Sequence, residues 1–280
     1  MPRNNQDRLG SQAPSADPPI PAPSTPSQLE FVVPTEFVEL PSKGLLYPEG
    51  HPLCEVSEVE IKFMTAKEED ILTDKVLLKK GLALDRLMSN IILDKTINPD
   101  MLLTGDRTAI MIAARKSAYG PEYDTKTVCP VCFSHGRHTF DLDNAEVRFN
   151  QGKDVASIDD NMTIRVTTPR SKVKVALKFM TGHDEKKILE KQNNNKRLKL
   201  PENSLINQLR TIIVSVNDNT DRRYINSFID AMPAFDSRYI RDIYQKNNPT
   251  IQLKEEYVCG ECNATSMVDV PFTTDFFWPQ

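Results

Sequence analysis

The sequence predicts an α+β protein in which two tandem repeats share one interrupted zinc ribbon of four cysteines. Two Cys-x-x-Cys pairs lie far apart, at residues 129–132 and 259–262. The tetrapeptide Lys-Phe-Met-Thr also occurs twice, at residues 62–65 and 178–181, and follows an extended, strand-like run each time. We therefore expect each repeat to contain a strand, a cluster of helices and one zinc knuckle.

Matching features follow one another in the same order, which favours a duplication. The spacing between them grows along the chain: 116 residues from Phe63 to Phe179, 121 from Ile91 to Ile212, and 130 from Asp106 to Asp236 and from Cys129 to Cys259. The increases fall in the stretches 192–203 and 217–231, where loops would tolerate insertions. Chance similarity between amphipathic segments is the alternative. A duplication places the repeats at residues 31–150 and 151–280.

The first 30 residues contain seven prolines and no apolar periodicity. Such a segment cannot bury enough apolar surface to offset the entropy of ordering. We expect a disordered Pro-rich arm over residues 1–30, with order beginning near Phe31. The arm is either a tether for a partner or a tail without a role.

The first repeat should open with two extended runs, residues 31–40 and 55–63, separated by a turn at Pro41–Gly44. Proline fixes φ in such a turn and glycine supplies the left-handed position. The turn and the segment after it have no clear counterpart in the second repeat.

Two capping boxes predict helix starts at equivalent places. Thr65 and Glu68 form a Thr-x-x-Glu box for a helix over about residues 66–79. Thr181 and Asp184 repeat the pattern more weakly, because aspartate is shorter than the glutamate that the box prefers.

Apolar residues at three- and four-residue spacing predict further helices. One buried helix runs from Leu84 to Ile92, and Asp106 caps another that ends at Gly120. In the second repeat the matching helices are expected over residues 204–216, 222–231 and 237–246.

The cysteine pairs carry the sharpest chemical prediction. A Cys-x-x-Cys turn places two thiolates on one side of a tight knuckle, and two knuckles complete a tetrahedral zinc site. Strand-like stretches flank the pairs as in a zinc ribbon, at residues 124–128, 138–142, 251–258 and 266–270. We expect one structural Zn²⁺ per chain that holds the repeats together, bound by Cys129, Cys132, Cys259 and Cys262.

Other readings of these residues are weaker. A redox dithiol is possible, but two pairs in equivalent contexts favour metal. His135 and His138 leave no room for a finger helix and have no match in the second repeat, so we interpret them as solvated loop residues. Cys54 is interpreted as a small buried hydrophobe.

Composition and motifs disfavour several functional classes. The net charge of −4 argues against a broad nucleic-acid-binding face. No apolar run approaches the about 20 residues of a membrane-spanning helix, and the N-terminus lacks the apolar stretch of a secretory signal. We therefore expect a reducing, cytoplasmic compartment. The sequence contains no nucleophile elbow, phosphate-binding glycine loop or metal-binding His-Glu helix. We therefore expect that the protein is not an enzyme.

Two aromatic segments are candidate partner contacts. Leu46 and Tyr47 follow the unmatched turn, and the tail carries Phe276, Phe277 and Trp278. Apolar and aromatic residues are typical of interface centres, although both segments would also suit the protein's own core. The basic run over residues 186–199 is interspersed with asparagine, which favours a solvated loop over a nucleic-acid contact.

Three motifs stand out together: Leu-Pro-Ser-Lys-Gly-Leu-Leu-Tyr-Pro at residues 40–48, Lys-Phe-Met-Thr-Ala-Lys-Glu-Glu at residues 62–69, and the first cysteine pair. On these motifs the chain resembles the baseplate hub family of T-even-type tailed bacteriophages. The resemblance is strongest over residues 35–145. That family includes a hub subunit and a hub-assembly catalyst, where "catalyst" means an assembly factor. No catalytic residues come with the resemblance.

The resemblance implies a protein made in the cytoplasm of the infected bacterium. It would contact other hub and tail proteins, and would either stay in the virion's tail baseplate or leave after assembly. A zinc-ribbon adaptor that binds nucleic acid or the transcription machinery is the alternative. Salt-dependent DNA binding would favour that alternative, whereas co-purification with hub or tail proteins would favour the first.

Overall fold

The computed structural model describes residues 32–149, 158–159, 161–199, 201, 203–270 and 274–277. The chain divides into two compact units, Met1–Val33 and Pro34–Gln280, and all elements below belong to the second. The predicted disordered arm, residues 1–30, lies outside the described residues. Among the helices of the described part, none has the length and apolar character needed to cross a membrane.

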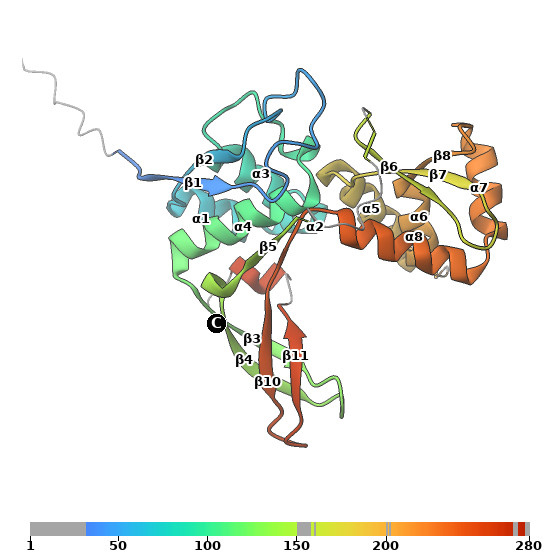
Figure 1. Cartoon of the computed structure of the whole chain (residues 1–280). Helices are drawn as coiled ribbons and strands as arrows, with labels where there is room; N and C mark the ends of the chain where they lie inside the picture. Colours follow the sequence, from blue (N-terminus) through green and yellow to red (C-terminus); the bar gives the residue numbers. More distant parts are fainter. Residues whose placement is uncertain are drawn as a thin grey trace, which may run out of the picture. The chain divides into compact units, whose positions relative to one another are not determined.

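We call residues 34–149 the first half of this unit (Figure 1). Its opening strands β1 (Thr35–Glu39) and β2 (Glu58–Lys62) pair antiparallel. The helices that follow are α1 (Ala66–Thr73), α2 (Lys75–Lys80), α3 (Ala83–Ile91), the 3-10 helix η2 (Pro99–Met101) and α4 (Thr104–Tyr119). The half ends with the hairpin β3 (Glu122–Val128) and β4 (His135–Asp141), then η3 (Leu142–Asn144) and β5 (Glu146–Arg148).

We call residues 158–277 the second half. Its three-stranded antiparallel sheet has the order β6 (Thr163–Thr167), β7 (Lys174–Lys178) and β8 (Ile213–Val216). The helices are α5 (Gly182–Arg197), α6 (Ser204–Ile212), α7 (Arg222–Ala231) and α8 (Ala234–Asn247). Strand β9 (Thr250–Gln252) pairs with β5 of the first half, and the hairpin β10 (Lys254–Val258) and β11 (Thr265–Asp269) precedes the 3-10 helix η4 (Thr274–Phe277).

The opening strand pairs of the two halves have the same register. The paired positions are Thr35–Lys62 and Val38–Val59 in β1–β2, and Thr163–Lys178 and Val166–Val175 in β6–β7. The inner strand of each pair then meets the residue after a helix: Ile61 bridges Ile92 after α3, and Leu177 pairs with Ile213 after α6. The opening strands of the two halves, and their pairing with the residue after a helix, are thus alike.

Both predicted capping boxes are present. The Thr65 amide donates to the Glu68 carboxylate at 2.9 Å, and the Thr181 amide donates to Asp184 at 3.1 Å. A lysine at the end of the preceding strand contacts each carboxylate, Lys62 at 2.8 Å and Lys178 at 2.7 Å. The short aspartate therefore serves the box in the second half as glutamate does in the first.

Several predicted boundaries were wrong. The helix expected over residues 66–79 is broken at Asp74, whose side chain accepts the Val76 amide at 2.7 Å and so starts a second helix, α2. The helix expected over residues 204–216 stops at Ile212, because the next four residues pair with β7 as β8. The helix over residues 222–231 is confirmed as α7.

Asp106 does not cap α4, contrary to the prediction. The helix begins two residues earlier, and the buried Asp106 carboxylate accepts the Ser42 amide at 2.9 Å and the Tyr47 hydroxyl at 2.7 Å. In the second half, the buried Asp236 accepts the Ser171 amide at 2.8 Å. The turn at Pro41–Gly44 therefore has a counterpart, because Asp236 holds the turn around Ser171 in the same way.

The two halves share one apolar core and meet at the start of α5. Leu103 bridges Thr181, and the Gly182 amide donates to the Leu102 carbonyl at 3.0 Å. A Cβ atom on Gly182 would lie 2.4 Å from the guanidinium of the buried Arg107, so a larger residue there would require this side chain to shift. The start of α5 is therefore fitted to the first half.

The basic run over residues 186–199 is not a loop. Its residues up to Arg197 belong to α5, and Lys186 contacts Asp85 of the first half at 2.7 Å. This lysine therefore pairs with a carboxylate of the same chain.

Candidate metal centre

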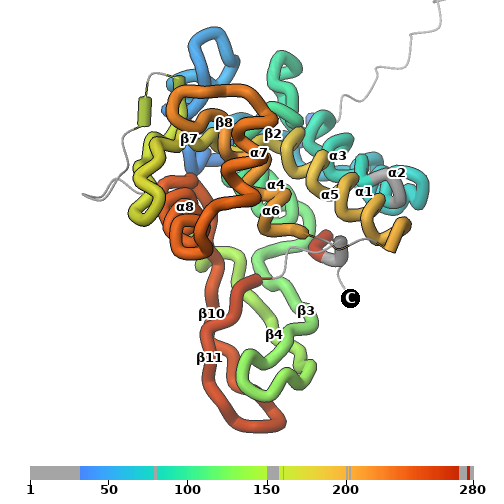
Figure 2. The backbone as a smooth tube through the Cα atoms, turned by 90° about the vertical axis from the view of Figure 1, so that its right-hand side faces the viewer, coloured from blue at the N-terminus to red at the C-terminus, as the bar shows by residue number. Residues whose placement is uncertain are grey.

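The two cysteine pairs lie at the turns of matched hairpins. Cys129 and Cys132 occupy the turn between β3 and β4, and Cys259 and Cys262 occupy the turn between β10 and β11. Figure 2 shows these hairpins side by side, although 130 residues separate the start of one pair from the start of the other. The strands expected around both pairs are thus confirmed, with shifted bounds.

The backbone of each turn forms the same knuckle. The Cys129 amide donates to the Ser134 carbonyl at 2.9 Å and the Phe133 amide donates back to the Cys129 carbonyl at 3.0 Å. The Cys259 amide donates to Ala264 at 3.0 Å, and Asn263 donates to the Cys259 carbonyl at 2.9 Å. These local bonds explain why both pairs of thiols point to one side.

The four sulfur atoms gather in one cluster. The ligand atoms all lie within 4.8 Å of one another, and the distances between the hairpins are 3.8 Å from Cys129 to Cys262 and 3.6 Å from Cys132 to Cys259. A tetrahedron with metal–sulfur bonds of about 2.3 Å has edges of roughly 3.8 Å. The cluster therefore fits a tetrahedral ion, and four sulfur ligands are typical of Zn²⁺.

Hydrogen bonds tune these thiols unequally. Ser134, with help from the amides of Cys262 and Glu261, lowers the pKa of Cys259 to about 6 and also lowers the pKa of Cys132. The Ala264 amide favours the Cys262 thiolate, but contact with Cys132 together with burial prevails and raises the pKa of Cys262 to about 12. Four adjacent thiolates repel one another, so a divalent cation would stabilise the fully ionised cluster.

The hairpins are locked together below the cysteines by polar contacts. The Asp141 amide donates to Glu255 at 2.8 Å, and His138 lies 3.3 Å from the same carboxylate. A Cβ atom on Gly136 would approach the Tyr257 hydroxyl oxygen to 2.1 Å, so glycine lets this ring lie between the hairpins. His138 is therefore a half-buried strand residue, which corrects its interpretation as a solvated loop residue.

Ser134 is the site residue that sequence reasoning missed. Its hydroxyl oxygen lies 3.0 Å from the Cys132 sulfur and 3.3 Å from that of Cys259, so one side chain contacts both pairs. The sequence shows that Ser134 lies two residues after Cys132, but it does not show that the side chain reaches Cys259 of the other hairpin. The second knuckle has Ala264 at the equivalent position, so the pattern does not single out a serine. Cys54 is half-buried and lies outside the cluster.

The predicted partner contacts are mostly in the core. Leu46 and Tyr47 are 5% and 2% exposed, and Phe276 and Phe277 are both 2% exposed. Phe276 packs edge-on against Tyr123 at 5.0 Å, close to the buried Arg115. Trp278 lies outside the described residues. In this conformation the four described side chains offer a partner almost no surface, as the core interpretation expects.

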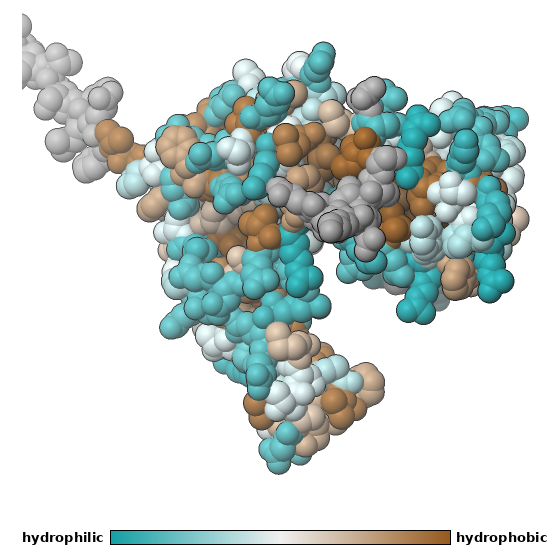
Figure 3. All heavy atoms as spheres, in the orientation of Figure 1, coloured by the Kyte–Doolittle hydropathy of each residue, from teal (hydrophilic) through white to brown (hydrophobic). Residues whose placement is uncertain are grey.

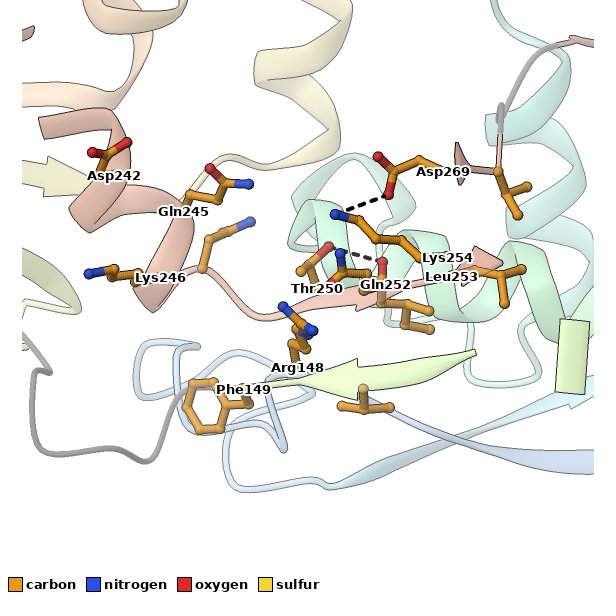
Figure 4. Close-up of a pocket in the computed structure, with 14 residues that line it drawn as sticks. Arg148, Phe149, Asp242, Gln245, Lys246, Thr250, Gln252, Leu253, Lys254 and Asp269 are labelled. Atoms are coloured by element: carbon orange, nitrogen blue, oxygen red, sulfur yellow. Dashed lines mark hydrogen bonds and ion pairs between the residues drawn. The ribbon is translucent and has the colours of Figure 1, made fainter. Parts of the chain in front are cut away.

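A hollow of about 770 Å³ lies between β5, β9 and the end of α8 (Figure 4). Its lining mixes the cations Arg148, Lys246 and Lys254 with the carboxylates Asp242 and Asp269. Lys254 and Asp269 already form an ion pair at 3.7 Å. Among its described lining residues, this open surface with partly compensated charges gathers neither a nucleophile with its base nor a pair of close carboxylates.

Comparison with known proteins adds one match. A family model described as "T4 bacteriophage base plate protein" matches residues 34–278, which span both halves and all four clustered cysteines. No curated protein and no solved structure matches the chain significantly.

Proposed function

Because the chain belongs to the T4 bacteriophage base plate protein family, we propose that it is a hub subunit or a hub-assembly factor of a phage baseplate. It acts through protein–protein contacts during morphogenesis of a contractile tail, with other hub and tail proteins as partners. The family match carries this proposal, since it covers nearly the whole described unit. Synthesis and assembly would take place in the host cytoplasm.

The proposal assigns the cysteine cluster a structural role. Cys129, Cys132, Cys259 and Cys262 hold one Zn²⁺ per chain, as a zinc ribbon whose knuckles are separated by inserted sequence. The cation supplies no reaction chemistry and serves as a cross-link between hairpins. The separations of 3.8 Å and 3.6 Å between sulfurs support it. Elemental analysis of chain purified without chelator should find one zinc; none, or two, would contradict the assignment.

We further propose that the halves arose by tandem duplication. The equal strand registers, the two capping boxes, the buried aspartates and the matched knuckles support it. A duplicated ancestor explains why the two knuckles face each other, because two copies of one hairpin can meet about a pseudo-twofold axis.

We propose no covalent catalysis for this chain. The clustered thiols fit metal ligands, and the hollow beside β9 lacks a set of reacting groups among its described residues. The negative charge of the chain also gives no support to a nucleic-acid adaptor.

Mass spectrometry of purified virions and of infected cells tests the proposed role. A hub subunit should be present in virions in stoichiometric amounts, whereas an assembly factor should be abundant in infected cells and absent from virions. In either case, loss of the gene should arrest assembly before the hub is complete. Normal baseplates without the chain, together with salt-dependent binding of the purified chain to DNA, would contradict the proposal.

A further inference from the structure

The tips of the two knuckles differ although their backbones match. Phe133 and Asn263 both follow the second cysteine of a pair, and both have positive φ, at 59° and 53°. Asparagine tolerates this left-handed conformation well, whereas a bulky aromatic residue rarely adopts it. The first knuckle therefore carries a side chain that its backbone disfavours.

Packing within the described part of the chain does not explain Phe133. Its side chain is 74% exposed, so it gains little from burial in this conformation. A residue held in a sparsely populated conformation without a packing benefit is a reason to look for function. The second knuckle demonstrates that the fold itself is satisfied by asparagine.

Phe133 belongs to an apolar tip. Val131, in the same turn, is 60% exposed, and Val128, the last residue of β3, is 46% exposed. The second knuckle has the acidic Glu261 where the first has Val131. Figure 3 shows hydrophobic atoms gathered at the lower end of the hairpins. We call Val128, Val131 and Phe133 the apolar tip.

A cationic row lies directly behind the apolar tip. Lys126 of β3 and Arg137 of β4 are opposite each other in the strand register, and both are exposed. Arg137 also contacts Asp124 at 3.6 Å, but an exposed pair of this kind is weak and leaves the guanidinium available. The equivalent positions on the second hairpin hold Glu256 and Met267. The first hairpin alone thus combines an apolar end with two adjacent cations.

We propose that the apolar tip is an anchor that inserts into an apolar pocket of another baseplate protein, with carboxylates at the pocket's rim facing Lys126 and Arg137. This inference rests on the proposed function. A large aromatic at the centre, flanked by smaller apolar contacts and charges at the rim, is the usual composition of an interface hot spot.

The cations beside the apolar tip disfavour a second copy of the chain as its occupant. Tip-to-tip pairing would bring two rows of Lys126 and Arg137 together, and like charges repel. A pocket of another protein with carboxylates at its rim avoids this repulsion and offers opposite charges to the same two side chains.

Photocrosslinking in infected cells tests this directly. The photoreactive residue p-benzoylphenylalanine is placed at position 133 and, as a matched control, at position 263. Position 133 should crosslink to one baseplate protein, through a peptide with neighbouring Asp or Glu, and position 263 should not. A crosslink to a second copy, a crosslink within the chain to residues 1–31, equal crosslinks at both positions, or none at position 133 would each overturn the inference.

Substitution provides the second measurement. Phe133→Asn introduces the residue of the other knuckle, so its thermal midpoint should be no lower than that of the unmodified chain. Its affinity for the purified baseplate protein identified by the crosslink should fall roughly tenfold or more, and Met267→Ala should leave affinity unchanged. Unchanged affinity of Phe133→Asn would contradict the anchor. If the chain still supports baseplate assembly when these tests fail, only the anchor is lost and the proposed function stands.

Discussion

In the first half Asp106 accepts hydrogen bonds from one amide and two hydroxyl groups, whereas in the second half Asp236 accepts from two amides and one hydroxyl. Burial raises the pKa of Asp106 above its usual range. Burial acts on Asp236 as well, but the bonds from Ser171 and Arg170 prevail and lower its pKa. Equivalent carboxylates in equivalent turns therefore have opposite proton affinities.

The two directions follow from the balance between burial and hydrogen bonding. Every hydrogen bond favours the ionised carboxylate in both halves, but burial outweighs the bonds at Asp106 and is outweighed by them at Asp236. The donors also differ, because a backbone amide can only donate whereas a hydroxyl can either donate or accept. The first half gains its extra hydroxyl from Tyr47, which lies in a segment with no counterpart in the second half. The comparison teaches that two turns held by a buried aspartate in the same way can still differ in electrostatics, because a side chain outside the turn contributes to one of them.

The largest expected effect would come from removing a cysteine pair. If the two knuckles form one site, replacing Cys129 and Cys132 with serine, or Cys259 and Cys262 with serine, should each abolish zinc binding entirely. Binding free energy at such a site is also folding free energy, so both variants should melt roughly 10 °C or more below the unmodified chain. Zinc analysis and thermal melting measure the two effects.

Cys54→Ser is the matched control, because Cys54 is a free, half-buried thiol outside the cluster. It should retain one zinc. If one pair can be removed while the other still holds a full equivalent of zinc, the halves carry independent sites and the shared site is refuted.

The carboxylate comparison predicts a smaller but asymmetric effect. In Asp236→Asn, the side-chain NH₂ group would replace one of the two oxygens that accept a backbone N–H. Two donors would then face each other, and the backbone amide cannot become an acceptor. The substitution should therefore cost about 2 kcal/mol. Asp106→Asn should cost about 1 kcal/mol, because the hydroxyls of Ser42 and Tyr47 can turn to accept. Chemical denaturation at neutral pH gives both free energies. Equal costs for the two substitutions would contradict the idea that hydroxyl donors adapt to asparagine better than backbone amides do.

The two pKa directions also give opposite pH dependences. The raised pKa of Asp106 means that its contribution to stability falls as pH rises from the unfolded value through the folded pKa. The lowered pKa of Asp236 means that its contribution is present above the unfolded value and is lost as pH falls through the folded pKa. From pH 3 to pH 7, the penalty of Asp236→Asn should grow and that of Asp106→Asn should shrink.

Two buried tyrosines allow the halves to be compared by removal of a single oxygen. The Leu103 amide donates to the Tyr47 hydroxyl at 3.0 Å, and the Met180 amide donates to the Tyr244 hydroxyl at 3.0 Å. Tyr47→Phe should cost about 2 kcal/mol, since it also removes a donor from Asp106, and Tyr244→Phe should cost about 1 kcal/mol. Equilibrium unfolding measures both free energies. A larger loss of unfolding free energy for Tyr244→Phe than for Tyr47→Phe would contradict the expectation that the bond to Asp106 makes the Tyr47 hydroxyl the more stabilising one.

The smallest expected effect concerns the first capping box. Burial of Glu68 is outweighed by hydrogen bonds from Lys62 and Thr65, so the pKa of Glu68 falls from 4.5 to about 2. Its contribution is therefore complete above pH 4.5 and is lost as pH falls toward 2. Glu68→Gln should cost about 1 kcal/mol at pH 7 and less at pH 3. A cost that does not change over this range would show that Lys62 does not stabilise the ionised form.

Local sequence signals predicted the parts of the fold that local bonds hold. The capping boxes at Thr65 and Thr181, the helix Arg222–Ala231 and the clustering of four cysteines are confirmed. The capping boxes and the helix depend on residues a few positions from one another. The meeting of the two knuckles does not, and was predicted from the similar sequence around the two cysteine pairs. Short sequence motifs also indicated the baseplate family, and the family match confirms it.

Partners distant in sequence decided what the local patterns could not. Ile213–Val216 has the periodicity of the preceding helix, yet it forms β8 because β7 offers an open edge with unpaired backbone groups. Asp106 has the position of a helix cap, yet the turn at Ser42 delivers donors to its carboxylate from 64 residues away. Tyr47 has the residue type of a surface anchor, yet its hydroxyl donates to that same buried carboxylate.

The sequence by itself therefore determined the clustering of the four cysteines, the two capping boxes and the family. The cysteine spacing within each pair and the capping chemistry act over one turn of chain. Only the tertiary structure decided which aromatic residues lie in the core and which remain exposed. It buries Tyr47 and Phe276 and leaves Phe133 74% exposed in a left-handed conformation. Composition treats all three as apolar residues of similar size. Burial depends on the arrangement of all neighbouring elements, and no local pattern contains that information.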